Sequence, residues 1–199
     1  MSSFTGKKAG DDFIRFHDLI SVESDRGAVL VSAALLDEGL QNLIQAKLIS
    51  STKEKDPLFH GAIAPLGTFS SRIEMALRLG LIDESLNSIL NTFRRLRNDF
   101  AHSYEPVKLE DQTPKNRITA ILNEYDDIRD KLDKTCLKSI TKVLAEKGHS
   151  DEDPKKFYED RWSTRATFDM FFATTAVVIH NIASEVTQLK PREKRTSGS

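Results

Sequence analysis

Residues 84–102 read ESLNSILNTFRRLRNDFAH, and this stretch decides the fold that the sequence predicts. Its apolar residues recur every three or four positions, as they do on one face of an α-helix. They are Leu86, Ile89, Leu90, Phe93, Leu96 and Phe100. Asp83 can cap the helix at its start, and Pro106 prevents much extension beyond Tyr104. The stretch therefore predicts a helix with one buried face.

Patterns of the same period flank this helix on both sides. They predict further helices over 12–20, 24–49, 69–79, 113 to about 147, and 153 to about 189. Thr68 or Ser70 can cap the helix over 69–79, and Gly80 is placed to end it in a left-handed conformation. No segment alternates apolar and polar residues as a strand does. We therefore expect an all-α fold, a single bundle of about six helices.

The length of 199 residues suits one domain with a sizeable core. The predicted organisation is a disordered N-terminus over 1–10, a helical bundle over 11–189 and a polar basic tail over 190–199. The start of the chain has no apolar core of the signal-peptide type, and the longest weakly polar run, 171–182, is too short to span a membrane. We expect a cytoplasmic protein without a membrane partner.

Charge and cysteine content limit the classes of function. The formal net charge of −1 gives no global attraction to nucleic acid or to an acidic membrane. Cys136 is the only cysteine, which excludes an intramolecular disulfide and a cysteine cluster for zinc. His17, His60, His149 and His180 do not pair with a second ligand at metal-binding spacing. We therefore expect no metal and no cofactor.

Polar residues gather at the end of the first stretch, where residues 96–103 read LRNDFAHS. On an ideal helix with Leu86 at zero, Arg97 falls at about 20°, inside the apolar stripe. A buried arginine is costly unless it meets an acceptor. Asp37 and Glu38 follow the mostly apolar run 29–36 and could supply one. A first interpretation is a structural ion pair between Arg97 and Asp37 or Glu38.

A second interpretation is catalytic. The spacing from Arg97 to His102 is R-x4-H, which resembles the signature of the HEPN superfamily of helical nucleases. The resemblance implies that His102 is an acid–base catalyst and Arg97 a phosphate binder, without a metal and often across a dimer interface. Asn98 shares a flank with His102 and completes this candidate site. Arg97 and His102 are about 140° apart on an ideal helix, so we expect that one chain alone does not focus both on one phosphate.

A longer set of segments resembles another family. Residues 33–38 (AALLDE), 65–73 (PLGTFSSRI), 76–82 (ALRLGLI) and 96–103 together resemble the mannitol operon repressor (MtlR) family over residues 24–104. The resemblance implies an all-helical transcriptional regulator, a repressor, that lacks a recognisable DNA-binding motif and acts through other proteins. The chain departs from that family in its fuller R-N-x-F-A-H form and in the segments 104–113 and 145–160, which keeps the nuclease alternative open.

These observations lead to an expected set of partners. We expect a protein partner and a homodimer under both interpretations, and RNA only under the nuclease alternative. Direct reading of DNA is not expected, because the helix pair 69–79 and 84–102 buries the first turns of its second helix on Leu86, Ile89 and Leu90.

Overall fold

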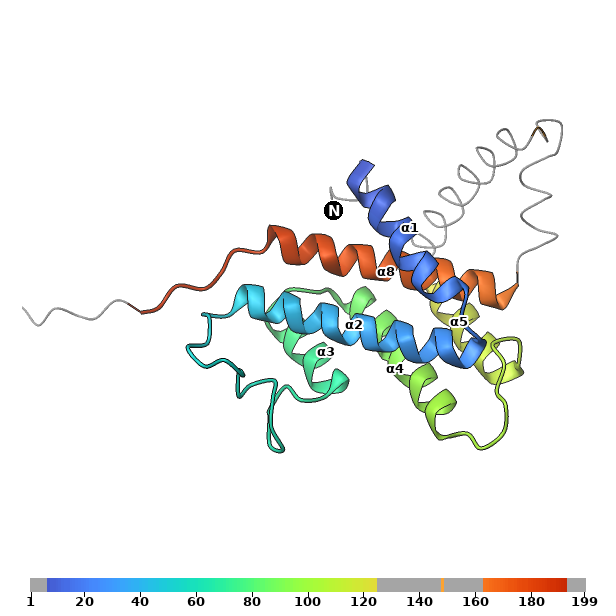
Figure 1. Ribbon diagram of the computed structural model, residues 1–199, viewed down its shortest axis with the longest axis horizontal. Helices are drawn as coiled ribbons and strands as arrows, with labels where there is room; N and C mark the ends of the chain where they lie inside the picture. Colours follow the sequence, from blue (N-terminus) through green and yellow to red (C-terminus); the bar gives the residue numbers. More distant parts are fainter. Residues whose placement is uncertain (1–6, 125–147, 149–162, 193–199) are drawn as a thin grey trace, which may run out of the picture.

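The computed structural model of the chain describes residues 7–124, 148 and 163–192 (Figure 1). These residues form six helices and no strand, which confirms the predicted all-α class. The helices are α1 (Lys7–Ser21), α2 (Asp25–Lys47), α3 (Phe69–Arg78), α4 (Glu84–His102), α5 (Gln112–Glu124) and α8 (Thr164–Glu185).

Short polar side chains cap α2, α3 and α4, and the caps Thr68 and Asp83 are those that the sequence predicts. The side chains of Ser24, Thr68 and Asp83 accept hydrogen bonds from the free backbone N–H groups of α2, α3 and α4. Gly80 has a φ of 65°, the left-handed conformation expected after the end of α3. These capped helices therefore begin within one or two residues of the positions that the sequence predicts.

The bounds of other helices differ from the prediction. α1 begins at Lys7 rather than at residue 12, so part of the segment expected to be disordered is helical. Its first residues, two lysines and an alanine, are good helix formers, which explains the earlier start. α5 begins at Gln112 and holds Pro114 in its first turn.

The predicted helix over 153–189 is wrong as one continuous element. Ser163 is extended, with φ −87° and ψ 160°, and its side chain caps α8 by accepting from the N–H of Ala166. α8 then ends at Glu185, before the predicted residue 189. The expected continuation of α5 to 147, Cys136 and the helix start at 153 lie outside the described residues.

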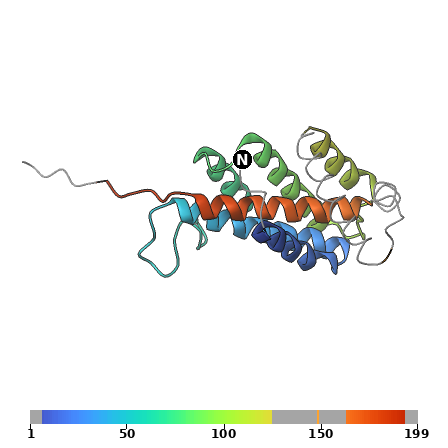
Figure 2. The same ribbon diagram turned by 90° about the horizontal axis from the view of Figure 1, so that it is seen from above.

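α2 lies at the centre of the bundle and packs against α1, α3, α4 and α8. It runs parallel to α8, and two contacts show this. Asp25 at the start of α2 pairs with Arg165 at the start of α8. Near the other ends of the two helices, the N–H of Leu189 donates to the Lys47 carbonyl at 2.8 Å. Figure 1 shows α1 across α8 on one side of α2, and α3 and α4 on the other side. Figure 2 shows the same helices from above, with α8 along the length of the molecule.

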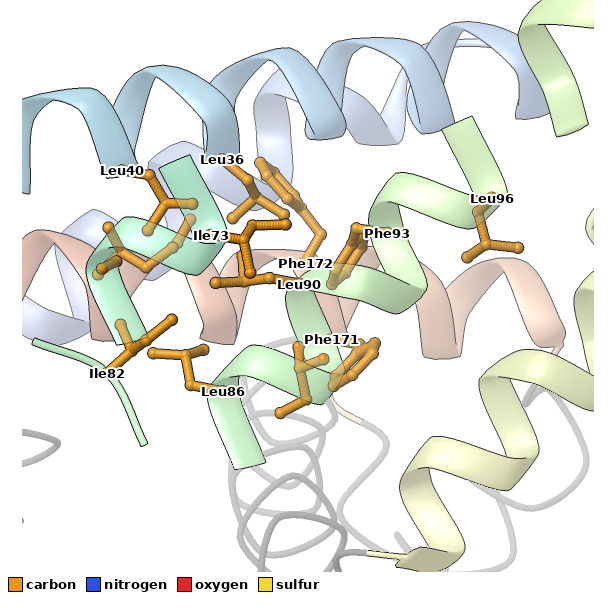
Figure 3. Close-up of a cluster of buried hydrophobic side chains, with 14 of the residues drawn as sticks. Leu36, Leu40, Ile73, Ile82, Leu86, Leu90, Phe93, Leu96, Phe171 and Phe172 are labelled. Carbon is orange, nitrogen blue, oxygen red and sulfur yellow. The ribbon is translucent and has the colours of Figure 1, made fainter. Parts of the chain in front are cut away.

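The core joins α2, α3, α4 and α8. Figure 3 shows Leu36 and Leu40 of α2 beside Ile73 of α3 and Leu90 of α4. Phe93 of α4 stacks on Phe171 with ring centroids 5.1 Å apart and meets Phe168 edge-on at 5.5 Å. These three rings are fully buried, so Phe168 and Phe171 of α8 belong to the core. The core fixes α4 along its length and so sets which of its residues face outward.

Candidate functional site

The end of α4 presents Arg97 and His102 to solvent, with Asn98 half-buried between them in sequence. Arg97 Nη1 donates a hydrogen bond to Asn98 Oδ1 at 3.2 Å. Asn98 and His102 are four residues apart and share one flank of the helix. The hydrogen bond therefore draws the Arg97 guanidinium toward the flank that carries His102. No direct contact between Arg97 and His102 is found in the described residues.

The predicted ion pair between Arg97 and Asp37 or Glu38 is wrong. Asp37 instead pairs with Arg72 of α3, with Arg72 Nη1 at 2.8 Å from Asp37 Oδ1. Glu38 is exposed. The positive charge of Arg97 acts on Asp37 only through space, and lowers its pKa less than Arg72 does. Within the described part of the chain, neither carboxylate forms an ion pair with Arg97.

The error comes from the choice of origin on the helical wheel. The buried residues of α4 also include Thr92, Leu96 and Phe100, which lie to one side of Leu86. Toward the end of α4 the buried residues are Thr92, Phe93, Leu96 and Phe100, and their centre lies about 65° from Leu86, so Arg97 is about 85° away from it, at the edge of the buried face. An arginine at the edge of a buried face extends its charged end into water.

Arg72 is the arginine that the fold buries within the part of the chain that the structure describes. It donates to the Leu66 carbonyl from Nε at 2.9 Å, contacts Asp37, and lies over the Phe59 ring at 5.8 Å. Asp37 Oδ1 is buried and close to Arg72 but accepts no aligned hydrogen bond in the structure. Burial therefore raises the pKa of Asp37, and the nearby Arg72 offsets this only in part.

Sequence reasoning missed this role of Arg72, although a signal was present. Arg72 lies next to Ile73 and four residues before Ala76, and all three are buried in α3. An arginine at such a position on a short helix predicts an acceptor on a neighbouring element. The sequence analysis names Asp37 or Glu38 as the acceptor for Arg97 and does not consider Arg72, which is the arginine that Asp37 meets.

A second arginine, Arg26 of α2, holds the end of α4. Its Nε donates to the Phe100 carbonyl at 2.8 Å, and its Nη2 donates to the carbonyl of Ser103. These carbonyls have no partner within α4, because the last turn of a helix leaves its C=O groups unpaired. Arg26 supplies both donors and a positive charge at the negative end of the helix. The turn that carries His102 is therefore fixed to α2.

Asp99 anchors the same end of α4 from its other side. Its carboxylate pairs with Arg117 Nη1 of α5, and both side chains are about one-third exposed. Asp99 therefore joins α4 to α5. The candidate site residues that remain exposed here are thus Arg97 and His102, with Asn98 beside them.

Other parts of the described chain offer less chemistry. Within residues 7–124, 148 and 163–192, no three His, Cys, Asp or Glu side chains are grouped so that they could hold a metal ion. A cavity of about 260 Å³ lies between the end of α2 and the loop that follows it, where Leu48, Lys53 and His60 form part of its wall. None of the residues in the candidate site lines this cavity.

The fold and the site define an all-α bundle with an exposed arginine–histidine end on α4. Comparison of the chain with protein-family models, with curated proteins and with solved structures finds no match.

Two helices in the described residues, α2 and α8, are long and apolar enough to cross a membrane by length and composition alone. Core helices of proteins that never enter a membrane pass the same criterion, and both helices lie at the centre of the bundle.

Proposed function

We propose that this protein is a transcriptional regulator, a repressor of the mannitol-repressor type, that acts by binding another protein through the outer face of α4. One observation supports the proposal. Among the polar residues in the segments that resemble that family, Asp37 and Arg72 contact each other inside the bundle. Arg97 and His102 are exposed and are not needed for packing. Residues that do not serve the core are candidates for recognition.

The arrangement of α3 and α4 favours a protein partner over direct contact with DNA bases. A recognition helix places its first residues in the major groove. The first turns of α4 instead bury Leu86, Ile89 and Leu90 in the core. The arginines of α4 lie in its second half, beyond these turns.

Deletion of the gene tests the proposed regulation. We expect the transcript levels of at least one operon to rise in the deletion strain and to return when the wild-type gene is restored. A pull-down with the tagged full-length chain is expected to retain a component of the transcription machinery or another regulator. Unchanged transcript levels, together with no such partner, would remove the proposal.

A second candidate function is metal-independent cleavage of RNA, and a specific observation favours it. Arg97 forms no ion pair within the described residues, and Asn98 holds its guanidinium on the flank that carries His102. An arginine can bind a phosphate through paired donors, and a histidine can transfer protons near neutral pH. His102 would then remove the proton from the attacking hydroxyl or protonate the leaving oxygen.

The geometry of one helix limits this second candidate. Arg97 and His102 are about 140° apart on an ideal helix, so a second copy of the chain is expected to complete the site. The purified chain would be incubated with RNA in EDTA and compared with His102→Ala and Arg97→Ala. Cleavage that both substitutions abolish supports the nuclease. Equal cleavage by wild type and by His102→Ala excludes it.

A further inference from the structure

The outer face of α4 carries more positive charge than the candidate site alone. We define the α4 arginine face as Asn91, Arg94, Arg95, Arg97, Asn98 and His102. On an ideal helix these residues occupy an arc of about 160°, centred about 140° from the middle of the buried face of α4, with Arg97 at the border between the two. Each of them is exposed or half-buried, so the face is open to a partner.

Amide side chains hold two of the arginines in place. Asn91 Oδ1 accepts a hydrogen bond from Arg94 Nε at 3.2 Å, and Asn98 Oδ1 accepts one from Arg97 Nη1 at 3.2 Å. Asn91 is itself fixed, because its Nδ2 donates to the carbonyl and side-chain oxygens of Asn87. Since the guanidiniums are already oriented, less side-chain entropy is lost when they bind a ligand.

The face is positive although the chain as a whole is nearly neutral. Asp99 is the only carboxylate in residues 85–102, and it is paired with Arg117 of α5. The formal net charge of the whole chain is −1. A local concentration of guanidinium groups on such a chain is complementary to carboxylates on a partner.

We propose that the α4 arginine face docks an acidic, carboxylate-rich segment of a partner protein. This inference rests on the proposed function and names the chemistry of the partner. The face is short, since Arg94 and His102 are about 12 Å apart along the helix axis. Sequence-independent binding to nucleic acid typically neutralises about 6–10 phosphates, which needs a longer positive surface. Oriented arginines in a compact cluster are instead common energetic centres of protein interfaces.

Fluorescence anisotropy tests the inference with a labelled 20-residue helical peptide that carries glutamates along one face. The control peptide has glutamine at the same positions. We expect the full-length chain to bind the glutamate peptide, with weaker binding as salt rises. The double variant Arg94→Gln/Arg95→Gln is expected to bind at least tenfold more weakly. The matched control is Arg78→Gln, which removes an exposed arginine from α3, and it is expected to bind as the wild type does.

Three outcomes overturn the inference. The first is equal binding of the glutamate and glutamine peptides. The second is that Arg78→Gln loses as much binding as the double variant, while the double variant keeps the urea midpoint of the wild type. The third is tighter binding of poly(U) RNA than of the glutamate peptide. The last outcome would assign the face to nucleic acid.

Failure of the proposed function is a separate result. If the double variant restores normal transcription in the deletion strain, this inference fails alone. If deletion changes no transcript, the proposed function fails although the face binds the peptide.

Discussion

Arg72 and Arg97 both lie on helices that pack against α2, and their surroundings give them opposite roles. The Arg72 side chain is only 10% exposed and is surrounded by Asp37, the Leu66 carbonyl and the Phe59 ring. Removing a guanidinium from water is costly, and these groups offset that cost. Arg97 is exposed, and Asn98 holds its guanidinium at the surface. Arg72 therefore serves stability, whereas Arg97 is available for binding.

Substitution of Arg72 is expected to destabilise the fold. In Arg72→Gln, Asp37 loses its cationic partner and the Leu66 carbonyl loses a donor, so we expect the free energy of unfolding to fall by roughly 2–3 kcal/mol. Urea unfolding measures this change. The control Arg78→Gln removes a pair whose side chains are 77% and 64% exposed, and its expected cost is below about 0.5 kcal/mol. Equal costs for the two variants would contradict the role assigned to Arg72.

Asp37 is expected to give a characteristic dependence of stability on pH. Burial raises the pKa of Asp37 above its ordinary value of 3.8. The folded chain therefore keeps this proton over a pH range in which the unfolded chain has lost it. The contribution of Asp37 to the free energy of unfolding is then largest below pH 3.8 and falls as pH rises through the raised pKa.

The comparison of wild type with Asp37→Asn isolates this contribution, because asparagine does not titrate. We expect the difference in unfolding free energy, wild type minus variant, to decrease as the pH rises from 3.8 through the raised pKa of Asp37. Urea unfolding at a series of pH values measures it. An increase over this range would show instead that the pKa of Asp37 is lowered by Arg72.

At the scale of the element, α4 combines a buried face, a fixed end and an exposed face. Its start is capped by Asp83, its middle packs through Phe93, and its end is held by Arg26. The last turns, which carry the exposed residues, are thus held in place by Arg26 of α2. A helix end without such a support would fray.

Loss of the Arg26 side chain is expected to loosen the last turn of α4. In Arg26→Gln the carbonyls of Phe100 and Ser103 lose charged donors, at a local cost of about 1 kcal/mol. Hydrogen exchange of the backbone amides of residues 100–103 should accelerate about fivefold, since that free energy corresponds to such a factor. Arg15→Gln, which alters an exposed side chain on α1, should leave these amides unchanged. Equal exchange rates in Arg26→Gln and wild type would show that Arg26 does not hold the last turn of α4.

The helices and their caps could be predicted because they depend on residues close in sequence. Thr68, Asp83 and Gly80 act within three or four positions of themselves. The partner of Asp37 could not be predicted in this way, because Arg72 is 35 positions away. Periodicity shows which face of a helix is apolar, but not which other element covers each part of that face. This is why Arg97 was placed on the packing face and is found at its exposed edge.

At the scale of the whole molecule, Arg165 joins three helices. Its guanidinium pairs with Asp169 of α8 and Asp25 of α2, and it donates to the carbonyls of Ile20 and Glu23 at the end of α1. The Arg165 side chain is 21% exposed. Burial raises the pKa of Asp169, and the hydrogen bonds from Arg165 oppose this shift. One side chain thus connects the turn after α1 to the parallel pair α2 and α8.

Arg165→Gln is expected to destabilise the whole bundle by roughly 3 kcal/mol, because two carboxylates and two carbonyls lose their donor. The change is measured as a lower urea midpoint with an unaltered slope. Arg165→Lys keeps the charge but reaches fewer acceptors, so it should recover only part of the loss. A full recovery with lysine would show that charge alone matters and that the multiple hydrogen bonds do not.

The fold class of the molecule was predictable because apolar periodicity extends along the described helices and no strand pattern competes with it. The break at Ser163 was missed although its signal is local, since the Ser163 side chain caps α8 by accepting from the N–H of Ala166, only three residues away. The exposed end of α4 follows from long-range contacts made by Arg26, Arg72 and Asp99. Its function is a proposal that rests on this exposure.

Complementation of the deletion strain, with transcript levels as the readout, tests whether the exposed end of α4 carries the function. We expect wild type and Arg78→Gln to restore regulation. We expect Arg97→Ala and His102→Ala to fail to restore it, although both variants accumulate and unfold at the same urea concentration as wild type. Full restoration of regulation by both alanine variants would contradict the claim that the exposed end of α4 carries the function.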